Sequence, residues 1–162
     1  MPKAMSEDST CSVARSLGVV GDRWALLIIR DALIIGSTRF QEFRDGLGIA
    51  SNILAKRLAL LVEEGLMERR TYQESGVRSH DEYVLTEAGR SLSLVIGALA
   101  VWGRTHRPKS DGTSPRFTVD ESGLTARLAF VTSDGQEVAP ERLSAVRTAD
   151  AIDHRPDDRR VG

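Results

Sequence analysis

The segment from residue 47 to residue 86 constrains the fold of this chain more than any other part of its sequence. Within it, residues 51–64 carry apolar side chains at helical spacing, and Gly65 follows as a helix stop. The apolar positions that share one face of this helix are Leu54, Leu58, Leu61 and Val62. Two runs with strand composition, 67–73 and 81–85, then flank a polar stretch. The order predicts an amphipathic helix that leads directly into a β-hairpin.

The opposite face of this helix is polar or small. It carries Asn52, Lys56, Ala59 and Glu63, with Ile53 and Leu60 beside them. An Asn can pair with adenine and a Lys with guanine in the major groove, and a small Ala allows close approach. An ordinary solvated face has the same composition. The elements before and after the helix favour the base-reading interpretation.

Two helices are predicted at the start of the chain. Thr10 is the expected N-cap of the first helix, which Gly18 and Gly21 should break. Asp22 is the expected N-cap of the second helix, which Gly36 should end.

A short third helix is predicted immediately before the turn that leads to residue 51. The tetrapeptide 38–41 fits a capping box, so this helix should start near Arg39 and bury Phe40, Phe43 and Leu47. Helices followed by a hairpin in this order predict an α+β fold of the winged helix-turn-helix type, which reads DNA.

A fifth helix should start at the cap Thr86 and run to about His106, before Pro108. Its apolar stripe is continuous and longer than a small domain needs, which predicts that it dimerises by packing on the first helix of a partner. Core within the same chain is the alternative, and its inner half must serve that role as well. The candidate dimer contacts are Val13, Leu17, Leu92, Val95, Ile96, Leu99 and Trp102.

The chain is expected to divide into five stretches. These are a disordered N-terminus (1–9), the winged helix-turn-helix domain with its extra N- and C-terminal helices (10–108), a linker (109–115), a small β appendage (116–148) and a disordered tail (149–162). In the appendage, three short strands are predicted, with a hairpin turn at Asp134 and Gly135 and a short helix from Pro140.

Composition excludes several classes of function. No apolar run is long enough to span a membrane, and no signal peptide is evident, so a cytoplasmic, nucleoid-associated protein is expected. No phosphate-binding loop, dinucleotide fingerprint or nucleophile elbow is present, so no enzyme is expected. The three histidines, His80, His106 and His154, are too scattered for a metal site, and no cofactor is expected.

The predicted reading region holds most of the candidate DNA contacts. The full set of candidate contacts is Arg39, Ser51, Asn52, Ile53, Lys56, Arg57, Arg69, Arg78 and His80. Acidic residues nearly balance the cations here, and the whole chain has a net charge of −1, so electrostatic attraction to DNA should be weak. Useful affinity would require two copies of the chain on one double-stranded site. No small-molecule effector can be identified.

The chain resembles the HxlR family of bacterial winged-helix regulators. The residues that carry the resemblance are Cys11, Gly21–Trp24, Arg39–Phe40, Gly48–Ile49, Leu54–Leu58, Glu64–Leu66, Arg69, Tyr83–Thr86, Gly89 and Trp102–Gly103. The resemblance implies a homodimer that binds an inverted-repeat operator and controls transcription of nearby genes, as a repressor.

The chain departs from the family pattern at three places. Ser12 stands where relatives often have a proline after the first cysteine, and Gly76 and Val77 stand where relatives have prolines at the hairpin tip, so the contacts of the tip should differ from those of the family. Many relatives carry cysteine pairs in a C-terminal appendage, whereas residues 127–146 contain none. Ala50 replaces a hydroxyl cap, so the helix should begin at Ser51 or the next residue.

Some relatives sense oxidants or electrophiles through a cysteine placed like Cys11, the one cysteine of this chain. If Thr10 is the cap, Cys11 lies in the first helical turn, where the helix dipole and nearby Arg15 favour a thiolate. A buried structural thiol is the alternative. For the whole chain, the alternative function is a winged-helix protein-interaction module without specific DNA binding.

Overall fold

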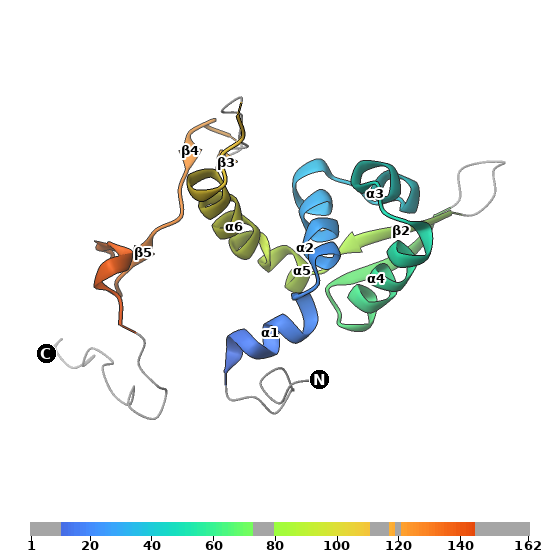
Figure 1. The fold of residues 1–162 in the computed structure, drawn as a ribbon, viewed down its shortest axis with the longest axis horizontal. Helices are drawn as coiled ribbons and strands as arrows, with labels where there is room; N and C mark the ends of the chain where they lie inside the picture. Colours follow the sequence, from blue (N-terminus) through green and yellow to red (C-terminus); the bar gives the residue numbers. More distant parts are fainter. Residues whose placement is uncertain (1–10, 73–79, 111–116, 119–120, 145–162) are drawn as a thin grey trace, which may run out of the picture. The chain divides into compact units, whose positions relative to one another are not determined.

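The computed structural model describes residues 11–72, 80–110, 117–118 and 121–144 (Figure 1). The chain divides into two units, with the boundary between Arg116 and Phe117. The first unit contains α1 (Ser12–Val20), α2 (Arg23–Arg30), a π-helical turn (Asp31–Ile35), α3 (Phe40–Leu47), α4 (Ser51–Glu63), β1 (Met67–Tyr72), β2 (His80–Leu85), α5 (Glu87–Ser91) and α6 (Ser93–His106).

The core of the first unit lies where α2 packs against α4. The side chains that are fully buried in these two helices are Ala25, Ile28, Ile29, Leu54, Leu58 and Leu61. Phe43 of α3 and Ile96 of α6 belong to the same cluster. Burial of a large apolar side chain contributes about 1.5–3 kcal/mol, so this cluster is the main stabilising element. The predicted inner face of α4 is confirmed.

The start of α1 differs from the prediction. The N-cap is Cys11 rather than Thr10, which lies outside the described residues, and the Cys11 side chain makes no capping hydrogen bond. Gly18 lies inside the helix, and Gly21 is its C-cap. The predicted cap and the predicted break at Gly18 are therefore wrong.

The second helix begins as predicted. The Trp24 amide donates to the Asp22 carboxylate at 2.9 Å, and Gly36 ends the helical stretch in the left-handed conformation with φ of 80°. The sequence did not predict that the last turn, from Asp31, is π-helical.

The cap of α3 lies one residue further along than predicted. Arg39 is the N-cap, and the Glu42 carboxylate accepts from the amides of Thr38 (2.8 Å) and Arg39 (2.9 Å). Arginine has no acceptor of its own, so the acid alone satisfies these amides. Of the three side chains predicted to be buried, Phe43 is buried, whereas Phe40 and Leu47 are half-buried.

Helix α4 begins at Ser51 without a side-chain cap, because its N-cap is Ala50. Gly48, in the left-handed conformation with φ of 59°, makes the turn from α3. At the other end, the Leu66 amide donates to the Leu61 carbonyl at 2.9 Å, and Gly65 has φ of 67°. This termination satisfies carbonyls that the helix leaves open and turns the chain into β1.

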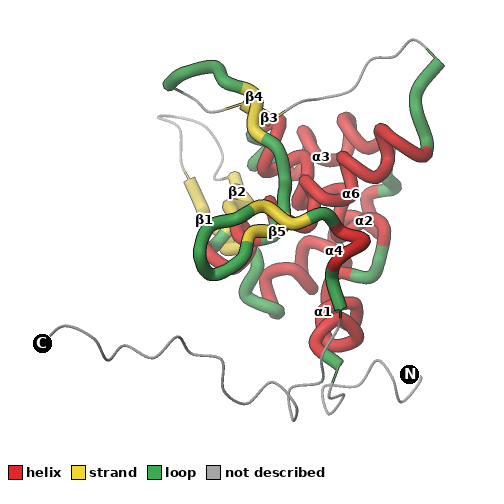
Figure 2. The backbone as a smooth tube through the Cα atoms, turned by 90° about the vertical axis from the view of Figure 1, so that its left-hand side faces the viewer, coloured by secondary structure: helices red, strands yellow, loops and turns green. Residues whose placement is uncertain are grey.

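The hairpin pairs β1 and β2 in antiparallel register, from Met67 opposite Leu85 to Tyr72 opposite His80 (Figure 2). The tip, residues 73–79, lies outside the described residues. The other edge of β2 is held by the segment before α3, since the Tyr83 amide donates to the Thr38 carbonyl at 2.7 Å. The hairpin is thereby fixed to the helix-turn-helix on two sides.

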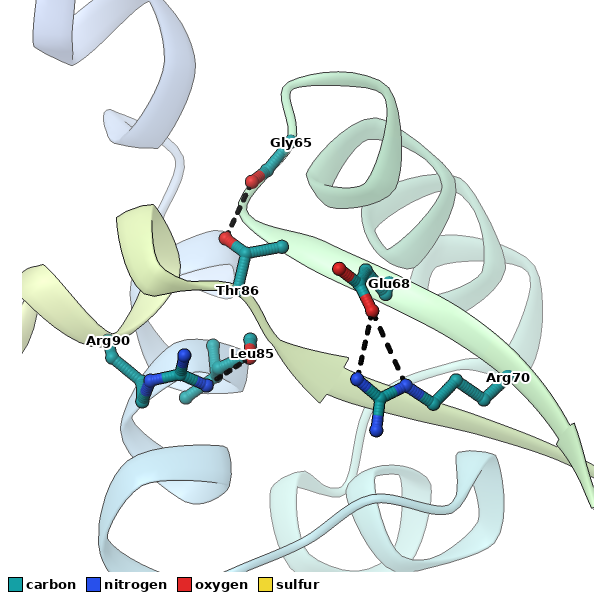
Figure 3. Close-up of polar contacts among 6 residues, drawn as sticks. All are labelled: Gly65, Glu68, Arg70, Leu85, Thr86 and Arg90. Carbon is teal, nitrogen blue, oxygen red and sulfur yellow. Dashed lines mark hydrogen bonds and ion pairs between the residues drawn. The ribbon is translucent and has the colours of Figure 1, made fainter.

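The predicted fifth helix is not continuous. Thr86 caps α5 as predicted, since its hydroxyl accepts from the Gly89 amide at 3.1 Å and donates to the Gly65 carbonyl at 2.7 Å (Figure 3). The helix then breaks at Leu92. The Ser91 hydroxyl donates to the Ala88 carbonyl, which an uninterrupted α-helix would pair with the Leu92 amide. The Leu92 amide donates instead to the Gly89 carbonyl at 3.3 Å, which tightens the last turn of α5.

The described part of the second unit consists mainly of short hairpins. Here β3 (Phe117–Thr118) pairs with β4 (Thr125–Ala126), β5 (Phe130–Val131) pairs with β6 (Glu137–Val138), and a 3₁₀ turn (Pro140–Arg142) follows. The predicted set of three strands is therefore wrong. The predicted turn at Asp134 and Gly135 is confirmed, since it joins β5 to β6 and Gly135 has φ of 86°.

The close approach of α5 to the end of α4 yields a stability prediction. A Cβ at buried Gly89 would lie 2.0 Å from the Leu66 carbonyl oxygen, so Gly89→Ala must push α5 away. We expect a loss of about 1–3 kcal/mol in the free energy of unfolding, measured by urea denaturation.

Gly103→Ala is the matched control, because a Cβ at Gly103 in α6 would meet nothing within 4 Å. This helical substitution should stabilise the chain by about 0.5–1 kcal/mol. Equal effects of the two substitutions would contradict the close packing of α5.

Candidate DNA-binding surface

The outer face of α4 is open to solvent over its first two turns. Ser51, Asn52 and Lys56 are exposed, as is Ala55 between them, and Ala59 in the next turn is exposed as well. The buried leucines on the opposite side fix this orientation, because helical periodicity places Asn52 and Lys56 on the far face. An Asn and a Lys one turn apart can thus reach one groove of a duplex together.

Ile53 and Arg57, two other candidate contacts, face partly inward. Ile53 is half-buried and packs against the core cluster. The Arg57 Nη2 lies 3.0 Å from the Asp22 carboxylate, and each side chain of this ion pair is about one-third exposed, at 34% and 32%. Arg57 therefore points along the side of α4, toward α2, whereas the adjacent Lys56 is exposed.

Arg39 lies at the junction of the hairpin and α3. It is exposed, and its backbone bridges to Glu82 of β2. The hydrogen bonds from the Arg39 and Thr38 amides hold the pKa of the Glu42 carboxyl below its ordinary value. The carboxylate is thus ionised at neutral pH and fixes the backbone of Arg39 at the start of the helix.

The strand arginines are exposed but paired with neighbouring acids. Arg69 lies 2.5 Å from the Asp81 carboxylate across the hairpin, and this hydrogen bond raises the pKa of Arg69. Arg70 donates to Glu68 on its own strand at 3.0 Å (Figure 3). Exposed ion pairs are worth little in water, so DNA phosphate can replace the acid in either pair.

The remaining hairpin candidates are located only in part. Arg78 lies outside the described residues, and His80 is the first residue of β2. Their contacts therefore stay predictions from the sequence.

Most of the candidate dimer contacts form apolar surface on the outer helices. On α1, Val13 and Leu17 are 65% and 46% exposed. On α6, the exposed large side chains are Leu94, Val95, Leu99 and Trp102. Ile96 is instead buried in the core of its own chain, and Leu92 packs against that core. Ile96 is therefore a core residue of its own chain, and its helix α6 is in contact with α2.

Other classes of site find no support in the described part of the chain. No group of three His, Cys, Asp or Glu side chains there could hold a metal ion. No helix within the same residues is both long enough and apolar enough to cross a membrane.

The partners of the candidate cations could not be read from the sequence. Asp22 was predicted as a cap, but its contact with Arg57 joins positions 35 residues apart. The Arg69–Asp81 contact follows only from the strand register. The period of the apolar residues predicts which way α4 faces. It does not predict which acidic side chain pairs with which arginine.

Comparisons with known proteins agree with this geometry. The profile of the HxlR-like helix-turn-helix family matches residues 19–111. The chain is 45% identical over 134 residues to Rv3095 of Mycobacterium tuberculosis H37Rv, an uncharacterized HTH-type transcriptional regulator, and the match covers 82% of this chain and 83% of that one. YdeP of Bacillus subtilis, described in the same terms, is 33% identical over 102 residues, covering 62% and 77%.

Solved structures show the same fold. PA1607, a candidate transcription factor, superposes with a TM-score of 0.75 at 40% identity, covering 86% of this chain and 96% of its own. The redox regulator HypR in its oxidized form superposes with a TM-score of 0.53 at 32% identity, covering 60% and 98%. The predicted winged-helix fold and the predicted family are thereby confirmed: this chain belongs to the HxlR-like helix-turn-helix family, whose members are transcriptional regulators.

Proposed function

We propose that this chain is a sequence-specific transcriptional repressor that binds an inverted-repeat operator as a homodimer. The observation that carries the proposal is the exposed face of α4, on which Asn52 and Lys56 stand opposite the buried leucines. Family membership makes DNA the expected partner of this face.

In the proposed complex, α4 enters the major groove by its first two turns. Asn52 and Lys56 read base edges, and Ser51 bonds to a phosphate near the helix N-terminus. Arg39 and Arg69 approach the backbone from the start of α3 and from β1, where they fix the orientation of the protein but do not select the sequence. Arg78 and His80 extend the same contacts along the hairpin.

Charge and exposed apolar surface both support a homodimer. With a net charge of −1, one copy of the chain gains little electrostatic affinity for DNA. Large apolar side chains are exposed on α1 and α6, including Leu17, Leu99 and Trp102. Such surface is expected where two copies meet. A two-fold dimer presents two α4 helices to the two halves of a palindrome.

Replacement of either base-reading side chain tests this proposal. Asn52→Ala and Lys56→Ala should each cost about 1–3 kcal/mol of binding free energy on the duplex that the wild type selects from a randomised library. The dissociation constants are measured by fluorescence anisotropy against the selected duplex and against the unselected pool. Asn52→Ala should change binding to the pool little, because Asn52 carries sequence information and no charge.

Glu63→Gln is the matched control, since Glu63 is exposed at the far end of α4 and should leave selectivity unchanged. Specific binding of the wild type should weaken as salt rises. A wild type that selects no sequence would reject the proposal in favour of a protein-interaction module.

We further propose that Cys11 makes this DNA binding sensitive to oxidants. Cys11 is exposed at the N-cap of α1, beside the apolar surface assigned to the dimer, so oxidants can reach it in this chain. The similarity to HypR, a redox regulator, supports this role. Diamide can oxidise the Cys11 thiols of two copies to one disulfide, in which case diamide takes up the two electrons and two protons.

Cys11→Ala separates this role from general oxidation. Diamide should lower the affinity of the wild type for its selected duplex and should leave that of Cys11→Ala unchanged. Dithiothreitol should restore the wild type, because a disulfide is reversible. Indifference of the wild type to diamide would end this part of the proposal.

A further inference from the structure

One contact of the recognition helix is made to the start of α2. The Arg57 Nη2 donates to the Asp22 Oδ2 at 3.0 Å, across 35 residues of sequence. Asp22 is also the N-cap of α2, because its Oδ1 accepts from the Trp24 amide at 2.9 Å. One carboxylate thus accepts hydrogen bonds from two different helices, α2 and α4, through one oxygen each.

The Arg57 side chain is directed toward α2 by its pair with Asp22, and only about one-third of it is exposed. Its Nε is buried with no hydrogen-bond partner in the structure, while Lys56, the next residue, is exposed. Rotation of the guanidinium toward solvent would break the pair with Asp22 and leave a half-buried carboxylate with one donor fewer. An ion pair with this exposure contributes little to stability, but its hydrogen bond still fixes the relative geometry of the two side chains.

The position of the pair relates it to the reading face. Arg57 lies one residue beyond Lys56 and five beyond Asn52, so it flanks the exposed face of α4. Asp22 directly follows Gly21, the C-cap of α1. The leucines of α4 pack against apolar surface, which allows small rotations and translations of the helix, whereas a charged hydrogen bond defines both distance and direction.

We propose that the Asp22–Arg57 pair sets the rotation of α4 about its axis, so that Arg57 serves DNA recognition through Asp22 and does not contact DNA. This inference rests on the proposed reading of DNA by α4. Arg57 is then a positioning residue, and the α1–α2 corner is connected directly to the recognition helix.

A double-mutant cycle tests the inference. Asp22→Asn retains an oxygen that can cap α2 but removes the charge that holds Arg57. Arg57→Met retains the aliphatic length. Each single variant should raise the dissociation constant for the selected duplex by about tenfold. The dissociation constant of the double variant should be no higher than the higher of the two single-variant values, since both substitutions remove the same contact. Binding to the unselected pool and its salt dependence should stay unchanged.

Glu137→Gln is the control, because it removes the exposed Arg127–Glu137 pair in the second unit. It should alter neither binding nor fold. Urea denaturation of every variant, together with amide hydrogen exchange of α4 without DNA, detects unfolding. Faster exchange in α4 alone, with near-wild-type stability, is the result expected for the two single variants.

The outcomes separate the inference from the proposed function. If Arg57 contacts a phosphate, Arg57→Met lowers the slope of log affinity against log salt by about 0.9, and Asp22→Asn has no effect; this result overturns the inference alone. Unchanged selectivity in Asp22→Asn overturns it too. If the wild type selects no duplex, the proposed function and the inference fail together.

Discussion

The packing of α2 against α4 is the interaction on which the rest of this structure depends. Because Leu54, Leu58 and Leu61 are fully buried against α2, the opposite face of α4 must be solvent-exposed. The same burial fixes α3 through Phe43, and the termination of α4 at Gly65 delivers the chain into β1. The exposed position of Asn52 and Lys56 is therefore a consequence of the core, and a change in the core would move this face of α4.

Charged side chains on α3 and on the β1–β2 hairpin form local ion pairs. Arg44 pairs with Asp45, Arg69 with Asp81 and Arg70 with Glu68. On DNA, a phosphate would replace a carboxylate in such pairs, so the net electrostatic gain is smaller than the number of arginines indicates. In that case geometry and dimerisation must supply more of the affinity, which is consistent with a chain of nearly neutral charge.

Features set by local periodicity and by capping side chains could be predicted from the sequence. The face of α4 and the caps at Asp22 and Thr86 were predicted because they depend on residues within one or two turns. The predicted continuity between α5 and α6 was wrong because the Ser91 hydroxyl competes for a backbone carbonyl. The sequence could not show that Ile96 packs in the core of its own chain, since an apolar stripe does not reveal which of its side chains face that core. The Asp22–Arg57 contact is equally invisible, because it depends on how two helices cross.

Hydroxyl-radical footprinting on the duplex that the wild type selects tests the central claim most directly, namely that two copies of α4 read DNA from a fixed core. The account predicts two symmetric protected half-sites whose centres lie about one helical turn, ~34 Å, apart. Asn52→Ala should weaken both halves equally. A single asymmetric footprint, or uniform protection without sequence preference, would contradict the account.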